Sequence, residues 1–186
     1  KLNINSNKKP ISPYGKSKLL SFNLTKKFRN QHMIKTYNAV IFNTESIYRE
    51  KNYLIPKICN SAIRAYKYNT KTYFGNLDIA REWNWCDEQV QYILKFIKKK
   101  PQDFLLSNQK IYSAYQMLSF AFNYFKLNFK DYISYDKKYF RPDDFKTKKS
   151  ASALGFKKNN ISHNYKIYGK KIIYKLIKHY LNESKY

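Results

Sequence analysis

Short apolar runs alternate with longer amphipathic segments along this chain, and that alternation limits the possible folds more than any other feature. The run 39–42 is short, apolar and of the right length for a buried strand of a parallel sheet. Further strands are expected at 72–74, 104–106 and 132–135, and helices at 14–31, 55–66, 87–99, 113–126 and 170–182. Strands that alternate with helices in this way predict α/β architecture.

The apolar spacing also predicts which helix faces are buried. Val90, Leu94 and Ile97 fall on one face of the helix 87–99. Ser113 with Gln116 predicts a capping box at the start of the next helix. The other expected stripes are Leu19, Leu20, Phe22, Leu24 and Phe28 in the first helix, and Ile172, Ile173, Leu176, Ile177 and Tyr180 in the closing one. The segment 44–53 is expected to be a polar loop.

Positive charge is the unusual part of the composition. Thirty-seven Lys and Arg residues against 12 Asp and Glu residues give a formal net charge of +25. Such a balance is compatible with a polyanionic partner such as nucleic acid. The lysines are nevertheless spread through the chain, and residues with AT-rich codons dominate it, so we do not expect a nucleic-acid partner. The positive field would help to attract a pyrophosphate-bearing substrate.

Cysteine content and hydropathy exclude several other classes. Cys59 and Cys86 are the only cysteines and have no Cys-x-x-Cys spacing, which argues against a disulfide scaffold and against a zinc site. No apolar run approaches the roughly 20 residues needed to cross a bilayer. We expect no signal peptide either, since the given residues contain no such pattern. We therefore expect a reduced cytoplasmic protein with no metal and no membrane partner.

Tyr14 and Lys18 form the candidate catalytic pair. In a helix, residues i and i+4 lie on the same face, one turn apart. A nearby ammonium group stabilises a phenolate, so such a tyrosine can act as a general base on a sugar hydroxyl. The bare pattern Tyr-x-x-x-Lys is weak evidence in a chain with 19 tyrosines. Its flanks, Ser-Pro-Tyr-Gly-x-Ser-Lys at an expected loop-to-helix junction, resemble the extended short-chain dehydrogenase/reductases that act on nucleotide sugars.

A second motif narrows this resemblance. The segment 42–49, Phe-Asn-Thr-Glu-Ser-Ile-Tyr-Arg, is similar to the Phe-Asn-His-Glu-Ser-Pro-Arg-Arg segment of the GDP-mannose 4,6-dehydratase family, at a matching distance from the tyrosine. By this resemblance Asn43 contacts the substrate, and Thr44 and Arg49 contact the cofactor. Thr44 stands where the family has His, and Tyr48 where it has the first Arg. The segment follows an expected strand, and open α/β sheets bind ligands at that end.

The most specific match is Gly-Asn-Leu-Asp-Ile-Ala-Arg-Glu-Trp at 75–83, which resembles Gly-Asn-Leu-Asp-x-x-Arg-Asp-Trp. The resemblance gives Arg81 the role of binding the nucleotide diphosphate, through a guanidinium suited to phosphate. A surface salt bridge to Glu82 or Asp78 is the alternative role. Lys57 corresponds to a substrate-site lysine of the family, with a solvated helix position as the equal alternative.

Later blocks extend the resemblance over residues 9–182. Tyr-Phe-Arg-Pro at 139–142 is similar to the same four residues of the family and makes Arg141 a second phosphate ligand. Leu-Gly-Phe-Lys at 154–157 resembles a late Leu-Gly-Trp-Lys. The matches are collinear, although several motif positions differ.

The resemblance implies a fold and a reaction. The fold would be the C-terminal part of a Rossmann-type parallel sheet with its N-terminal half missing, plus a small α/β substrate-binding domain. Residues 1–50 would belong to the dinucleotide-binding domain and 51–186 mainly to the nucleotide-sugar-binding domain, with some segments returning to the first. The reaction would convert GDP-mannose to GDP-4-keto-6-deoxymannose with NADP, or with NAD, in a homo-oligomer.

One feature of the family is absent, and it leaves other functions open. The sequence contains only four glycines and no Gly-x-x-Gly-x-x-Gly, the loop that carries the cofactor pyrophosphate. We therefore expect a truncated chain that is inactive alone. The alternatives are another extended short-chain dehydrogenase/reductase, such as an epimerase or a reductase, and, in a different class, a basic nucleic-acid-binding protein or a non-catalytic remnant.

Overall fold

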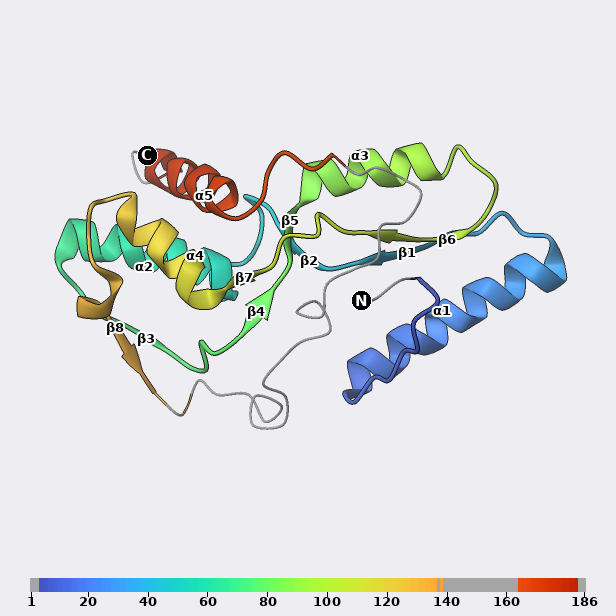
Figure 1. Cartoon of the computed structure of the whole chain (residues 1–186), viewed down its shortest axis with the longest axis horizontal. Helices are drawn as coiled ribbons and strands as arrows, with labels where there is room; N and C mark the ends of the chain where they lie inside the picture. The colour runs from blue at the N-terminus through green and yellow to red at the C-terminus, as the bar shows by residue number, and fades with distance from the viewer. Residues whose placement is uncertain (1–3, 137, 139–163, 184–186) are drawn as a thin grey trace.

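The computed structural model describes residues 4–136, 138 and 164–183. At one end, strand β1 (Asn38–Ile41) pairs in parallel with β6 (Asp103–Leu106), in the register Asn38 to Asp103. Helix α1 (Pro13–His32) lies on one side of this pair and α3 (Cys86–Phe96) on the other (Figure 1). The predicted α/β class is therefore confirmed.

Three further strand pairs connect this layer to the rest of the chain. Parallel pairs are formed by β2 (Asn43–Glu45) with β5 (Trp83–Trp85), and by β3 (Thr72–Phe74) with β8 (Ile133–Tyr135), which follows the 3-10 turn η1 (Phe129–Asp131). An antiparallel pair joins β4 (Ala80–Arg81) to β7 (Tyr112–Ser113). The β2–β5 pair lies between the α1–β1 end and the helices at the other end (Figure 1).

The main core lies among three helices at that other end: α2 (Leu54–Tyr68), α4 (Ala114–Asn123) and α5 (Lys170–Glu183). Each of the three packs on the other two. Their inward side chains are completely removed from solvent, including Ile58, Ala62, Met117, Leu118, Phe122, Ile172, Ile173, Leu176 and Ile177. A second, smaller core of Phe96, Phe104 and Leu106 lies between α3 and β6.

Several predictions about the helices are confirmed. The five apolar residues expected to line the closing helix are the five buried residues of α5. Ser113 and Gln116 form the predicted capping box of α4, with both reciprocal hydrogen bonds present. Ser12 caps α1 by accepting a hydrogen bond from the Gly15 amide, and Pro13 occupies the first turn, where a missing amide hydrogen is tolerated.

The predicted inward face of the helix 87–99 is wrong. Val90, Leu94 and Ile97 are 46%, 51% and 44% exposed, and the buried side chains of α3 are Gln89 and Phe96. The Phe96 ring stacks on Phe104 of β6 at a centroid separation of 4.2 Å. This aromatic contact, together with the buried Gln89, turns the helix so that the apolar stripe faces outward.

The first helix and its neighbouring strand are also less buried than predicted. No residue of α1 is buried, and Leu20, Leu24 and Phe28 are exposed. Ala39 and Ile41, which project from one face of β1, are exposed as well. The expected polar loop 44–53 begins inside β2, and β4, β5 and β7 are strands that the apolar pattern did not predict.

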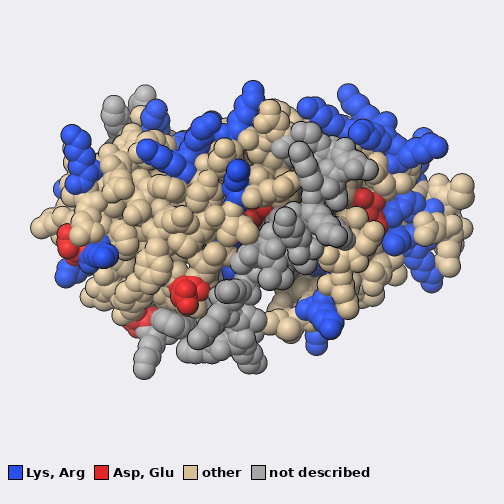
Figure 2. Space-filling model, in the orientation of Figure 1, with Lys and Arg blue, Asp and Glu red and all other residues tan. Residues whose placement is uncertain are grey.

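Basic side chains are distributed around the face shown in Figure 2, with only a few acidic groups among them. Within the described part of the chain, no helix is long and apolar enough to cross a membrane.

Candidate functional site

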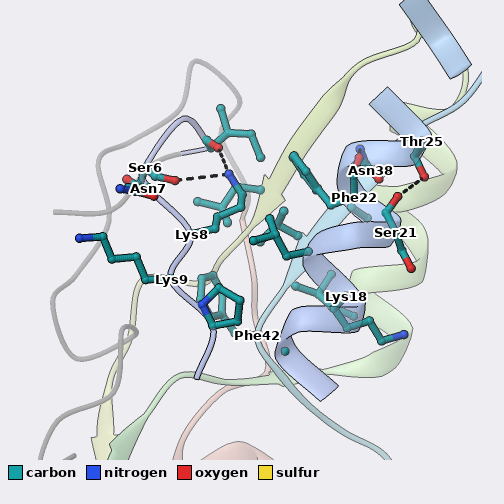
Figure 3. Close-up of a pocket in the computed structure, with 18 of the residues that line it drawn as sticks. Ser6, Asn7, Lys8, Lys9, Lys18, Ser21, Phe22, Thr25, Asn38 and Phe42 are labelled. Atoms are coloured by element: carbon teal, nitrogen blue, oxygen red, sulfur yellow. Dashed lines mark hydrogen bonds between the residues drawn. The ribbon is translucent and has the colours of Figure 1, made fainter. Parts of the chain in front are cut away.

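A groove lies between α1, β1 and the N-terminal segment 4–10 (Figure 3). Its volume is about 720 Å³. It runs along β1 from Asn38 and Thr25 at one end to Phe42 and Lys18 at the other. The Phe42 end is the carboxyl end of a parallel strand, where open α/β sheets place their ligands.

The segment 4–10 closes one side of this groove. The Lys8 ammonium donates hydrogen bonds to the carbonyls of Ile4 and Ser6, at 2.8 and 3.4 Å, and lies 4.6 Å from the centroid of the Phe22 ring (Figure 3). Gly15 permits the close approach of this segment to α1, because a Cβ at that position would lie 2.9 Å from the Pro10 Cβ. No sequence pattern indicated a role for Lys8, and the only signal for Gly15 is its place directly after Tyr14.

Tyr14 and Lys18 both line this groove, in the first turns of α1. The Lys18 ammonium lies 5.4 Å from the centroid of the Tyr14 ring, a cation–π arrangement over the ring face. Tyr14 is 73% exposed. The Lys18 ammonium projects away from the middle of the groove (Figure 3). The predicted pair is therefore together on one helix face at the mouth of the groove, and the phenol is open to a ligand.

Asn43 and Thr44 follow the groove on β2. The Asn43 side chain is exposed. The Thr44 hydroxyl lies 2.6 Å from Oε1 of the buried Gln89 and 3.1 Å from the Phe42 carbonyl. Gln89 belongs to α3, and its contact with the Thr44 hydroxyl helps to position Thr44. The sequence patterns did not indicate this role of Gln89.

Arg49 is directed onto its own segment of the chain. Its Nη1 donates a hydrogen bond to the Thr44 carbonyl at 2.9 Å, and its guanidinium carbon lies 4.0 Å from the centroid of the Tyr53 ring. Its Nε is 3.4 Å from Oε2 of the buried Glu45. Burial raises the pKa of Glu45 to about 8, and the charge of Arg49 opposes that rise. This cluster links β2 to the turn before α2.

Lys57 and Arg81 lie outside the groove that Tyr14 and Lys18 line. The Lys57 ammonium is 4.7 Å from the centroid of the Phe74 ring, and partial burial lowers the pKa of this amine. Lys57 is thus half-buried rather than a freely solvated helix residue. Arg81, in β4, donates a hydrogen bond to the Ala80 carbonyl at 3.0 Å. Arg141 falls outside the described residues.

Glu82 has a structural role that no sequence pattern indicated. Its carboxylate is fully buried and accepts hydrogen bonds from the Ser107 hydroxyl, the Asn84 amide and the Asn108 backbone amide, at 2.7, 3.0 and 2.8 Å. Burial raises the pKa of this carboxyl, and these hydrogen bonds oppose the rise. The suggested surface salt bridge between Arg81 and Glu82 is therefore wrong, because Glu82 points inward and fastens β5 to the end of β6.

Metal ligation and disulfide formation find no support in the part of the chain that is described. No group of three or more His, Cys, Asp or Glu side chains there could hold a metal ion. Both cysteines are free, with Cys59 buried and Cys86 partly exposed. The groups that could contact a nicotinamide ribose are the Tyr14 phenol and the Lys18 ammonium, since both stand at the groove mouth.

Comparison with known proteins identifies the family. The model of the family described as GDP-mannose 4,6 dehydratase matches residues 2–162. The chain is 31% identical over 155 residues to GDP-mannose 4,6 dehydratase 1 of Arabidopsis thaliana, and 25% identical over 154 residues to the human GDP-mannose 4,6 dehydratase. These alignments include 80% and 73% of this chain but 43% and 41% of the relatives, so the chain spans less than half the length of either.

Solved structures share the fold at low sequence identity. The dTDP-glucose 4,6-dehydratase of Bacillus anthracis, in complex with NAD, is similar with a TM-score of 0.76 and 12% identity, covering 100% of this chain and 57% of that one. The UDP-N-acetylglucosamine 4-epimerase of Methanobrevibacter ruminantium gives 0.73 and 15%, covering 98% and 57%. With the family match over most of its length, the chain belongs to the GDP-mannose 4,6-dehydratase family.

Proposed function

We propose that this chain carries the catalytic tyrosine and lysine of a nucleotide-sugar 4,6-dehydratase that converts GDP-mannose to GDP-4-keto-6-deoxymannose with NADP. The observation that carries the proposal is the Tyr14–Lys18 pair at the mouth of a groove, beside the carboxyl end of β1. A tyrosine placed there can act, as its phenolate, as the general base that accepts the proton of a sugar hydroxyl.

The reaction has four parts in this proposal: oxidation at C4, loss of water across C5 and C6, reduction at C6, and release of the 4-keto-6-deoxy sugar. Tyr14 removes the proton from the C4 hydroxyl, and Lys18 holds the cofactor ribose next to it. Thr44 and Arg49 complete the cofactor side of the site. A bound nicotinamide cofactor supplies the hydride acceptor and donor for the two redox parts.

The substrate side is assigned to Asn43, Lys57, Arg81 and Arg141. Asn43 is exposed at the start of β2, so its amide is accessible to a sugar. Arg81 and Arg141 would bind the diphosphate, since a guanidinium matches the geometry of phosphate oxygens. In this proposal residues 1–50 form part of the dinucleotide-binding domain and 51–186 mainly the sugar-nucleotide domain. The pairing of β6 with β1 supports the proposal that some segments of 51–186 belong to the dinucleotide-binding domain.

The 186 residues contain no Gly-x-x-Gly-x-x-Gly loop for a cofactor pyrophosphate. We therefore expect this chain on its own to bind a sugar nucleotide without turning it over. Turnover would need a dinucleotide-binding half.

A second candidate is an epimerase or reductase of the same superfamily. The similarity to a UDP-N-acetylglucosamine 4-epimerase, with a TM-score of 0.73, favours it. So does Thr44, which replaces the His of the dehydratase motif and has its hydroxyl occupied by Gln89. This candidate uses the same Tyr14 and Lys18 but omits the loss of water.

Titration calorimetry of the chain with GDP-mannose, dTDP-glucose and UDP-N-acetylglucosamine tests the substrate class. We expect GDP-mannose to bind most tightly and Arg81→Gln to weaken it at least tenfold. Arg64→Gln is the matched control, because Arg64 is an exposed arginine of α2. Absence of binding by all three nucleotides, or an equal loss in the control, would contradict the substrate assignment.

Product analysis separates the two candidate reactions. In the polypeptide expressed from the complete coding sequence, we expect a GDP-sugar that has lost one water, detected by mass spectrometry. Tyr14→Phe should abolish this product and leave substrate affinity nearly unchanged, whereas Tyr48→Phe, at an 89% exposed tyrosine, should be neutral. Product without loss of water would support the epimerase or reductase, and full activity of Tyr14→Phe would remove Tyr14 from the mechanism.

A further inference from the structure

A second groove, of about 650 Å³, lies on the outer side of α5, where this helix meets α4 and β7. None of its lining residues belongs to the groove of Tyr14 and Lys18. The two helices that carry the two grooves, α5 and α1, lie at opposite ends of the molecule (Figure 1). The proposed contacts to the sugar nucleotide, Asn43, Lys57 and Arg81, do not line it either.

The walls of this groove are aromatic. Tyr112 and Phe120 meet edge to face with ring centroids 5.9 Å apart, and Tyr168 and Tyr174 also line the cavity. The Tyr112 ring packs closely on Gly169, which has a φ of +51° and where a Cβ would lie 2.5 Å from the Tyr112 Cζ. Aromatic rings held in this way offer flat surfaces on which a planar heterocycle can stack.

The rim of the groove is cationic. Four exposed lysines of one helix line it: Lys170, Lys171, Lys175 and Lys178. Three of them, at spacings of four and three residues, share one helix face. The stripe from the first to the last of these three is roughly 10 Å long at 1.5 Å per residue. That length is suited to a short chain of phosphates.

This arrangement of charge is unfavourable without a counter-ion. Like charges at i and i+4 destabilise a helix, and cations in a first turn oppose the helix dipole. The first turn of α5 contains no acidic residue. Two of the four ammonium groups lie over aromatic rings, Lys170 at 5.0 Å from the centroid of Tyr174 and Lys175 at 5.2 Å from that of Trp85. A bound polyanion would supply the missing negative charge.

We propose that this groove binds a nucleoside polyphosphate, with the base among the tyrosine rings and the phosphates along the lysines of α5. A volume of about 650 Å³ is within the range of small-molecule sites. A single-stranded nucleic acid would need a basic track that continues beyond one cavity. The site is separate from the one that carries the proposed dehydration, so it can be present whether or not that proposal holds.

Calorimetry of the chain with ATP, adenosine and inorganic tripolyphosphate tests the two halves of the site. We expect ATP to bind more tightly than either fragment. The double variant Lys171→Gln/Lys175→Gln should weaken ATP at least tenfold. The control Lys16→Gln/Lys26→Gln removes the same charge from exposed positions of α1 and should change ATP affinity less than twofold. An equal loss in both would show that only the general positive field attracts ATP and would overturn the proposal.

Two further measurements fix the ligand class. Tyr168→Leu should weaken ATP but leave tripolyphosphate affinity unchanged, because it removes an aromatic ring and no charge. A thymidine oligonucleotide that binds more tightly than ATP, with the same dependence on the α5 lysines, would overturn the proposal in favour of nucleic acid. GDP-mannose should not displace ATP. Competitive displacement would mean that the sugar nucleotide binds in this groove, which would contradict the proposal of two separate sites. Thermal unfolding of each variant confirms that the chain remains folded.

Discussion

The α2–α4–α5 cluster and helix α1 are held in the protein by different kinds of contact. The cluster is a dry core, in which Leu118, Phe122 and Leu176 have no exposed surface. Helix α1 has no buried residue and is fastened by polar groups at its C-terminal half. The buried core that stabilises the fold is therefore in the α2–α4–α5 cluster, which carries no predicted catalytic residue. The Tyr14–Lys18 pair is on α1, which has fewer buried contacts.

The polar attachment of α1 is centred on Asp103 of β6. Its Oδ1 accepts hydrogen bonds from Arg29 at 2.6 Å and from the Asn38 amide at 2.9 Å. Asn38 also donates to the Phe22 carbonyl, and the Thr36 hydroxyl donates to the Thr25 carbonyl. The anchors stand at the far end of α1 from Tyr14, so the turn that carries the phenol depends on its cap at Ser12 and on the segment 4–10.

The largest effect expected is on the core. Phe122→Ala should lower the free energy of unfolding by about 3–5 kcal/mol, because it removes a fully buried ring and leaves a cavity. Phe28→Ala, the same substitution at a 46% exposed position of α1, should cost less than about 1 kcal/mol. Urea denaturation of both variants measures the difference. Equal costs would mean that the two regions do not differ in burial as described.

The next effect concerns Glu45, in β2 at the junction of the two regions. Burial raises its pKa from the ordinary 4.5 to about 8, so the folded state binds a proton that the unfolded state releases in this range. Stability from this group is complete below pH 4.5 and falls as pH rises toward 8, by an amount on the order of 3 kcal/mol. Glu45→Gln should flatten the dependence, measured as urea midpoints from pH 5 to 8. An unchanged pH dependence in this variant would assign the slope to another group.

Loss of the α1 anchor should have a smaller, local effect. Asp103→Ala leaves Arg29 without its carboxylate partner and should cost about 1.5–3 kcal/mol. Hydrogen exchange should speed up in the amides of α1 and leave those of α5 protected. Asp78→Ala, at an exposed aspartate, is the control and should change neither. Uniform loss of protection in both helices would show that α1 and the core unfold as one unit.

The smallest effect expected is at Gly15. An added methyl group would lie 2.9 Å from the Pro10 Cβ, so Gly15→Ala should displace the segment 4–10 from α1. The change in unfolding free energy should stay below about 1 kcal/mol, since Ala is favoured over Gly inside a helix. Limited proteolysis should cleave the segment faster than in Lys16→Ala, the neighbouring exposed control. Identical cleavage rates would mean that Gly15 does not set this approach.

The sequence predicted the helices better than their faces. Helices α1, α2, α4 and α5 lie within a few residues of their predicted bounds, because caps and breakers are local signals. Which face of α1 or α3 is buried depends on the elements that pack against the helix, and these come from distant parts of the sequence. Strands β4, β5 and β7 are two or three residues long and carry no usable alternation, so no local pattern could have revealed them.

Local chemistry along the chain determined the α/β class, the capped helix that carries Tyr14 and Lys18, and the family to which the chain belongs. Only the tertiary structure decided that Tyr14 stays exposed, that Glu82 is buried in a hydrogen-bond network, and that Val90 of α3 faces outward. The physical reason is that periodicity identifies a potential buried face, whereas burial itself requires a second surface, and that surface comes from residues far away in the sequence.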